Sequence, residues 1–280
     1  MSDNTLCLLM GDGRPSTIDR SPMAKSLLIL IEGTDELLPV AKGIGARRID
    51  GSIYHWRADA RGDMPETYIS CTGVGTTRSY ECTKKRISEC DPGLIVSAGT
   101  FGAIVDGIGQ HEWMCNARTR MLGDVADKRA MKDDIDADAR HASHVARLRE
   151  GCEAVGVKWL EGRLICVGDV PLFTEEEKAA LAKQHDAVGV DMETFGIAQA
   201  ANEAGIPWVT ARVCVDTPSI PLPDFGALNH TTGRPYYGRL FKWIFLHPIK
   251  CVPTLYGLWK LVNVYGKQLA AIVRQGYLKP

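Results

Sequence analysis

The amino-acid sequence predicts an α/β fold: a mixed, mostly parallel central sheet flanked by helices, with a helical appendage at the C-terminus. Short apolar runs alternate with helical segments between residues 26 and 216, a pattern typical of a parallel sheet covered by helices. Residues 188–216 read as strand, helix, strand, which predicts a right-handed crossover joining two neighbouring parallel strands. The composition changes sharply after residue 224, which marks the appendage.

Each element has its own local signal. The run 26–31 is short and almost wholly apolar, which favours a buried first strand. Thr174 with Glu177 fits a capping box that opens a helix. Strands are expected at 26–31, 67–71, 94–97, 163–167, 188–191 and 208–215, with an extended segment at 110–120. Helices are expected at 37–42, from 76 to about 90, at 139–155, from 174 onward and from 194 to 205, with a loop at 132–138.

Three parts of the chain differ in composition. Residues 1–25 mix glycine and proline with polar residues and predict a flexible N-terminal extension. Residues 26–224 form the expected α/β domain. Residues 225–280 contain no Asp or Glu, eight Lys or Arg and ten of the 20 aromatic residues. This tail therefore carries +8 in a chain whose net charge is −1.

The composition of the tail is compatible with two structural roles. Residues 254–273 place Leu258, Leu269 and Ile272 on one helical face and Lys260 and Lys267 on the other, which is helical amphipathicity. Such a helix packs on the main sheet or on a partner subunit. Alternatively, basic and aromatic residues without acids suit an anionic bilayer surface, which predicts a peripheral membrane contact through residues 236–280.

Cysteine usage and the N-terminus indicate the compartment. Nine cysteines without a CxxC pair or zinc spacing favour reduced thiols. The N-terminus lacks a basic region before its short apolar run, unlike a secretory signal, and no apolar run approaches 18 residues. We therefore expect a cytoplasmic protein that can lie peripherally at the inner membrane surface. A nucleic-acid role is disfavoured, since the tail's aromatics follow a helical apolar face.

Two carboxylates follow neighbouring predicted strands. Glu193 comes just after the strand that ends at Asp191, and Asp216 ends the next strand. Ligands bind outside the carboxyl ends of parallel strands, so both should face one pocket. Helix capping and turn formation explain the same residues without any function.

The motif Val-Asp-Met-Glu at 190–193, an alanine-rich helix, Gly-Ile-Pro at 205–207 and Arg212 before Asp216 resembles the nucleoside phosphorylase and nucleosidase superfamily. Thr72-Gly73-Val74-Gly75 and Ser97-Ala98-Gly99-Thr100-Phe101-Gly102 are similar to two of its glycine loops. The resemblance spans about residues 26–275. It is closest to the methylthioadenosine/S-adenosylhomocysteine nucleosidases and the hopanoid-associated phosphorylases, whose C-terminal plan the tail resembles.

The resemblance implies cleavage of the N-glycosidic bond of an adenosine-type purine nucleoside, which is lipid-linked in the hopanoid branch. Asp216 would be the general acid for the leaving base and Glu36 the general base. Glu32 offers a competing register for Glu36. A homo-oligomer, at least a dimer, is also implied. The implied substrate-binding residues are Thr72, Gly73, Ala98, Gly99, Phe101, Leu172, Met192 and Glu193.

Hydrolysis is favoured over phosphorolysis. The segment after the first strand carries Glu32, Asp35 and Glu36, which would repel phosphate, and Arg78 is the one obvious anion partner in the second loop. Phosphate is a co-substrate only in the phosphorylase alternative, and no other cofactor is expected. A catalytically weak nucleoside-binding or interaction protein is the alternative of another class.

Two further motifs are set aside. Gly73-Val74-Gly75 lacks the third glycine and the later acidic residue of a dinucleotide site. His141 and His144, spaced i, i+3 beside acidic residues, are read as part of an exposed charged helix rather than a metal site.

Overall fold

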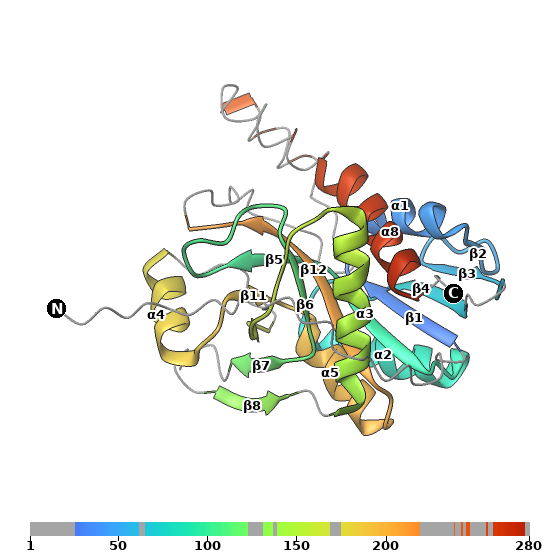
Figure 1. Cartoon of the computed structure of the whole chain (residues 1–280), viewed down its shortest axis with the longest axis horizontal. Helices are drawn as coiled ribbons and strands as arrows, with labels where there is room; N and C mark the ends of the chain where they lie inside the picture. The colour runs from blue at the N-terminus through green and yellow to red at the C-terminus, as the bar shows by residue number, and fades with distance from the viewer. Residues whose placement is uncertain are drawn as a thin grey trace.

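The computed structural model describes residues 26–61, 65–122, 131–136, 139–168, 175–218 and 260–277, with five separate positions between 238 and 256. It is a mixed α/β molecule (Figure 1). The predicted N-terminal extension and most of residues 219–259 lie outside the described residues.

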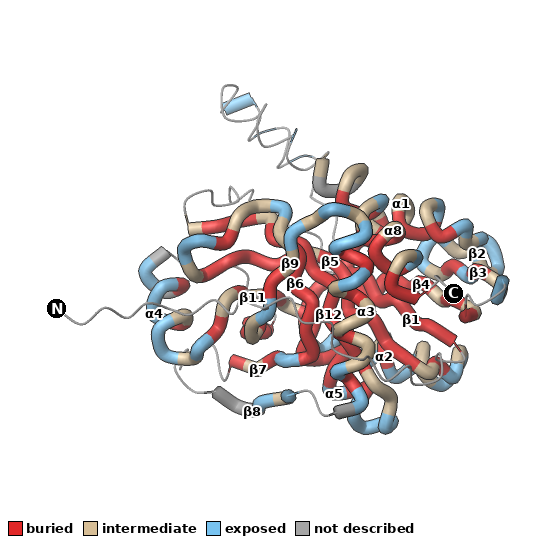
Figure 2. Tube along the Cα trace, viewed as in Figure 1, coloured by how far each residue is buried: buried red, intermediate tan, exposed pale blue. Residues whose placement is uncertain are grey.

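Four parallel strands form the centre of the sheet. Strand β1 (Ser26–Ile31) lies between β4 (Glu66–Cys71) and β5 (Leu94–Ala103). Strand β12 (Trp208–Asp216) pairs with the other edge of β5. All six residues of β1 are buried, so both faces of the sheet are covered here, as the central red strands in Figure 2 show.

The remaining strands extend this centre on two sides, partly in antiparallel fashion. The hairpin strands β2 and β3 continue the sheet beyond β4, and the other strands lie beyond β5 and β12. They are β2 (Arg47–Arg48), β3 (His55–Ala58), β6 (Trp113–Asn116), β7 (Thr119–Leu122), β8 (Met131–Ile135), β9 (Trp159–Leu160), β10 (Leu164–Cys166) and β11 (Gly189–Asp191).

The helices pack in two groups. Helix α2 (Thr76–Cys90) packs on α5 (Thr194–Glu203). In the second group, α8 (Gly266–Tyr277) lies between α1 (Thr34–Ile44) and α3 (Ala139–Val155). Helix α4 (Glu175–His185) stands apart, and a π-helical turn at Leu261–Tyr265 leads into α8.

Several expectations are confirmed and others are wrong. The 26–31 strand and the 139–155 helix have the predicted bounds. The predicted loop at 132–138 forms strand β8 in part, and the segment 110–120 contains parts of two strands. The glycine-rich stretch 98–102 belongs to β5 and is not a loop, because its backbone pairs with β12 along its whole length.

The predicted pairing of the last two strands is wrong. Strands β11 and β12 are not neighbours; each pairs with β5. Strand β11 runs antiparallel to β5 at Gly102 and Ala103, whereas β1 runs parallel to it as far as Ala98. Because β12 occupies the opposite edge, β1 and β11 point at each other along one edge of β5. Their carboxyl ends therefore meet across residues 98–102.

The helix α3 is less exposed than expected. His141 is buried with its ring edge-on to Trp208, at a centroid distance of 5.8 Å. The half-buried His144 ring stacks on Tyr277 of α8, and burial lowers the pKa of His144 to about 4. The expectation of an exposed charged face is therefore wrong for this pair. All seven described cysteines are free thiols.

The C-terminal helix α8 is part of the core. Its apolar face, including Leu269 and Ile272, belongs to the main hydrophobic cluster. A side chain on Gly151 of α3 would lie 2.3 Å from the Ile272 carbonyl oxygen, and one on Gly266 would lie 2.7 Å from Pro39 of α1. These close approaches fix α8 on both helices. No helix among the described residues is long and apolar enough to span a bilayer.

We expect Ile272→Ala to lower the free energy of unfolding by about 2–5 kcal/mol, because it leaves a cavity at a fully buried position. The matched control is Lys267→Ala on the exposed face of the same helix, which should change it by no more than about 0.5 kcal/mol. Chemical denaturation followed by circular dichroism measures both. Equal effects would show that α8 is not part of the cooperative core.

Candidate active site

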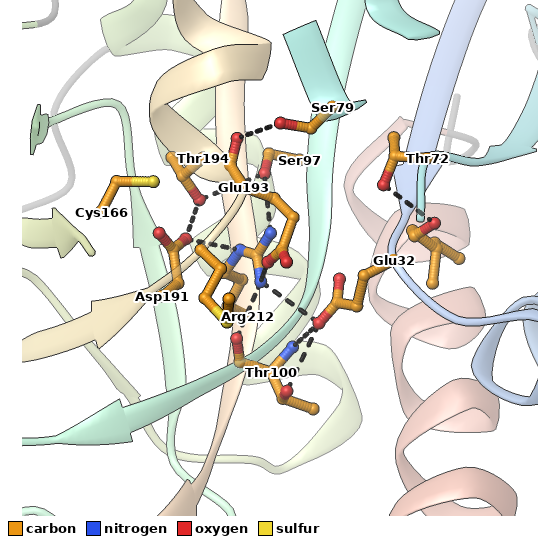
Figure 3. A network of polar contacts seen from close by, with 12 residues as sticks. Glu32, Thr72, Ser79, Ser97, Thr100, Cys166, Asp191, Glu193, Thr194 and Arg212 are labelled. Carbon is orange, nitrogen blue, oxygen red and sulfur yellow. Dashed lines mark hydrogen bonds and ion pairs between the residues drawn. The ribbon is translucent and has the colours of Figure 1, made fainter. Parts of the chain in front are cut away.

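Arg212 is the centre of the most charged cluster in the described part of the chain. It lies on β12 opposite Gly99 of β5 and is fully buried. Its guanidinium forms ion pairs with Asp191 at 3.0 Å and with Glu32 and Glu193 at 3.3 Å each. Figure 3 shows these carboxylates converging on the guanidinium from the ends of β1 and β11. The Arg212 cluster is defined here as these four residues.

The head-to-head arrangement of β1 and β11 creates this cluster. Glu32 follows β1, and Glu193 follows β11 at the N-cap position of α5. Both thus approach β5 near Gly99 and Thr100. The Thr100 backbone N–H donates to Glu32 at 2.9 Å, and the Gly75 N–H donates to Glu193 at 3.0 Å. The cluster ties the sheet to the loop before α2.

Gly99 is required for the cluster to form. A Cβ atom at this position would lie 1.9 Å from a Glu32 carboxylate oxygen, and the backbone φ is +145°. Both the close approach and the positive φ exclude a side chain. In the predicted glycine-rich lining of the site, the absence of a side chain therefore leaves space for the Glu32 carboxylate.

Burial changes the acidity of two carboxyl groups. Desolvation, with Glu32 adding to it and Arg212 opposing it, raises the pKa of Glu193 to about 8. Desolvation and the charge of Glu32 also raise the pKa of Glu36 well above 4.5. At neutral pH the folded protein therefore holds a proton on Glu193.

Glu36 lies in the first turn of α1 and borders a small cavity. The cavity has a volume of about 20 Å³ and is lined also by Gly99, Thr100, Trp113 and Tyr265. One carboxylate oxygen of Glu36 is buried without a hydrogen-bond partner among the described residues. Because Tyr265 precedes α8, the C-terminal tail forms part of the cavity wall beside Glu36.

Asp216 ends β12, four positions after Arg212, which lies in the middle of that strand. This spacing places their Cα atoms about 13 Å apart. Asp216 is buried at the end of β12, where a β-bulge follows Cys214. Its carboxylate accepts from Lys178 Nζ of α4 at 2.7 Å. Gly102 lies beneath it, because a Cβ there would be 2.5 Å from the carboxylate.

Thr72 and Gly73 face a second, open groove of about 490 Å³. The Thr72 hydroxyl donates to the carbonyl oxygens of Gly73 and of Ile31 in β1. Three cations, Arg78, Lys85 and Arg86, line the groove from α2. The predicted ribose-side loop therefore borders a basic groove, while its Gly75 end reaches Glu193.

Other predicted binding residues are buried or partly buried. Phe101 is 2% exposed and packs against Gly189, and Met192 packs on a cluster around Ile165. Ala98 is fully buried in β5. None of the three lines either cavity described above. Leu172 lies outside the described residues.

Three charged residues of these sites carry little signal in the sequence. Arg212 belongs to the motif without an implied role, and Glu32 offers only an alternative register for Glu36. Lys178 gave no signal, because a lysine in a charged helix is usually exposed. Of the described residues of α4, only Lys178 and Leu181 are buried, and this i, i+3 spacing places both on one face.

Comparisons with known proteins agree with this architecture. A family model described as the phosphorylase superfamily matches residues 62–227, more than half of the chain. No curated protein sequence matches. A solved structure of the methylthioadenosine/S-adenosylhomocysteine nucleosidase of Neisseria meningitidis, in complex with methylthio-immucillin-A, is 14% identical. It has a TM-score of 0.64 and covers 89% of this chain and 99% of its own.

Two further structures share the fold. The futalosine hydrolase of Helicobacter pylori is 15% identical, with a TM-score of 0.61 and coverage of 89% of this chain and 97% of its own. The methylthioadenosine/S-adenosylhomocysteine nucleosidase of Campylobacter jejuni is 13% identical. It has a TM-score of 0.64 and covers 88% of this chain and 97% of its own.

The raised pKa of Glu193 predicts a pH-dependent stability. Between pH 4.5, its ordinary pKa, and about 8 the folded state holds a proton that the unfolded state has released. The free energy of unfolding must therefore fall as pH rises through this window. Glu193→Gln should flatten the fall, measured by chemical denaturation at pH 5, 6, 7 and 8. The exposed Glu150→Gln on α3 is the control; an unchanged slope in Glu193→Gln contradicts the assignment.

Proposed function

This chain belongs to the phosphorylase superfamily and is an enzyme of the nucleosidase and nucleoside phosphorylase kind, and from that premise we propose that it hydrolyses the N-glycosidic bond of a purine nucleoside. Glu36 acts as the general base on water, Glu193 binds the ribose hydroxyls, and Asp216 delivers the proton to the leaving base. The transition state resembles an oxocarbenium ion, as in glycoside hydrolysis.

The observation that carries this proposal is the cavity beside Glu36. Its volume of about 20 Å³ suffices for one water molecule, which needs about 10–15 Å³, and it is too small for phosphate. Burial raises the pKa of Glu36, and a carboxylate with a raised pKa is a stronger base. A water held there faces the group best suited to take its proton.

The Arg212 cluster also disfavours a phosphate nucleophile. The guanidinium already contacts three carboxylates and donates to the Thr100 carbonyl at 2.8 Å. It therefore has little capacity left for an anion. A phosphate dianion at this end of the site would lie among carboxyl groups that repel it.

We expect the protein to release free ribose and adenine or hypoxanthine from ribonucleosides at a rate independent of phosphate. Glu36→Gln should lower kcat by about 10²–10⁴, the usual size of a general-base contribution, and Glu150→Gln should leave it unchanged. Product analysis by chromatography, with and without phosphate, makes the measurement. Formation of ribose 1-phosphate would overturn hydrolysis.

Phosphorolysis is the second candidate, favoured by the groove at Thr72 and Gly73. The exposed Arg78, in the first turn of α2, lies in this groove with Lys85 and Arg86, and helix N-termini attract phosphate. If this candidate is correct, base release requires phosphate and Arg78→Gln raises the KM for phosphate, with Arg61→Gln as the control outside the groove.

We further propose that the substrate is an adenosine-type nucleoside linked to a lipid, as in adenosylhopane, and that the tail contacts an anionic membrane. Phe245, Leu246 and Tyr256 are exposed by 83%, 60% and 61%, in a segment that carries basic residues and no acids. The membrane contact is confined here to the part of the tail before α8, whose own apolar face is buried. A homo-oligomer remains part of the proposal and is tested by light scattering.

The double substitution Phe245→Ser and Leu246→Ser should reduce binding to anionic liposomes in low salt. It should leave turnover of small soluble nucleosides unchanged, because these residues lie outside the Arg212 cluster and the Glu36 cavity. Ile53→Ser, at a half-exposed apolar position on another surface, is the control in a liposome sedimentation assay. Equal sedimentation of all three proteins would contradict the membrane contact.

A further inference from the structure

The ion pair between Lys178 and Asp216 presents a chemical problem. Both side chains are about 9% exposed, and Nζ lies 2.7 Å from the carboxylate. The Lys178 Nζ donates a hydrogen bond to the Asp216 carboxylate. A carboxylate that accepts this bond needs a source for each proton that it passes to a leaving base.

The position of Lys178 is unusual for a structural lysine. It points inward from α4 beside the buried Leu181, which packs on Ile104 and Ile165. A buried charge costs several kcal/mol unless it is paired, and lysine rarely occupies such a site. A hydrophobic residue would fill the same face of α4 without this cost, so the ammonium needs a reason to be there.

We propose that Lys178 is the proton source for Asp216; this inference rests on the proposed function. As the C1′–N9 bond breaks, its electron pair passes to the base. The base takes a proton from Asp216, and Asp216 takes one from the Lys178 ammonium. Water adds to C1′ and loses a proton to Glu36. A proton returned through solvent to Lys178 completes the cycle, with ribose and neutral base as products.

The positions of Asp216, Lys178 and Glu36 agree with these separate roles. A side chain at Gly102 would clash with the Asp216 carboxylate, and Lys178 donates a hydrogen bond to one of its oxygens. Glu36 lies beyond Arg212, close to Gly99. The proton donor pair and the base thus come from different elements, β12 with α4 and α1, and departure of the base and attack of water take place on opposite faces of one carbon. Lys178 is thus a positioning residue with a transferable proton.

The test uses two variants of the full chain that separate charge from proton transfer. Lys178→Arg keeps a cation beside Asp216 but cannot give up a proton. Lys178→Gln keeps a hydrogen-bond donor without charge. Each is assayed with adenosine or inosine, whose base needs protonation, and with 4-nitrophenyl riboside, whose leaving group is a stable anion.

Both variants should lose about 10²–10⁴ in kcat on the nucleoside and less than about fivefold on 4-nitrophenyl riboside. If Lys178→Arg retains nucleoside turnover within about tenfold, Lys178 is only a counter-ion and the proposal is overturned. Equal losses on both substrates would also overturn it, because they indicate a structural role. Wild-type protein that cleaves neither substrate refutes the proposed function instead.

Folding is checked by thermal unfolding, and rates are compared among folded variants. The two substitutions test the relay independently, so misfolding of one leaves the other decisive. Asp216→Asn alone is a poor probe, because it leaves the Lys178 ammonium buried without its carboxylate, which costs about 3–5 kcal/mol. The double variant Lys178→Met and Asp216→Asn removes both charges and serves as the folding control.

Discussion

The buried guanidinium of Arg212 holds the site together. It has no exposed surface, yet it binds carboxylates that follow β1 and β11 and contacts β5 through the Thr100 carbonyl. Breaking a buried ion pair on one side leaves an unpaired charge at a cost of about 3–5 kcal/mol. The cluster therefore fixes the positions of the ends of β1 and β11, which pair with β5 but not with each other.

The same cluster explains why two carboxyl groups have unusual acidity. One cation serves several acids in a dry environment, so not all of them can be charged together. The result is a raised pKa at Glu193 and Glu36, while Glu32 keeps its ion pair with Arg212. A site with protonated and ionised carboxyl groups side by side can bind hydroxyls and also accept a proton from water.

The C-terminal tail consists of a buried part and an exposed part. Helix α8 is core: Leu269 and Ile272 pack between α1 and α3, and Tyr265 before it borders the Glu36 cavity. The exposed Phe245 and Tyr256 lie before it in the sequence. A deletion of the whole tail would confuse loss of the core with loss of a surface, so the two parts must be changed separately.

The sequence by itself determined the fold class, most strands and helices, and the presence of Glu36, Glu193 and Asp216 near strand ends. Apolar runs and helical periodicity are local, and so the 26–31 strand and the 139–155 helix were predicted with their bounds. The motif resemblance gave the superfamily, which the family model confirms.

Only the tertiary structure decided which of these residues meet. The carboxyl ends of β1 and β11 meet along one edge of β5, and β11 does not lie beside β12. This arrangement brings Glu32 to Arg212. Lys178 reaches Asp216 across 38 positions of sequence. Strand order and long-range ion pairs depend on how distant segments pack, and residue spacing along one chain does not encode that packing directly.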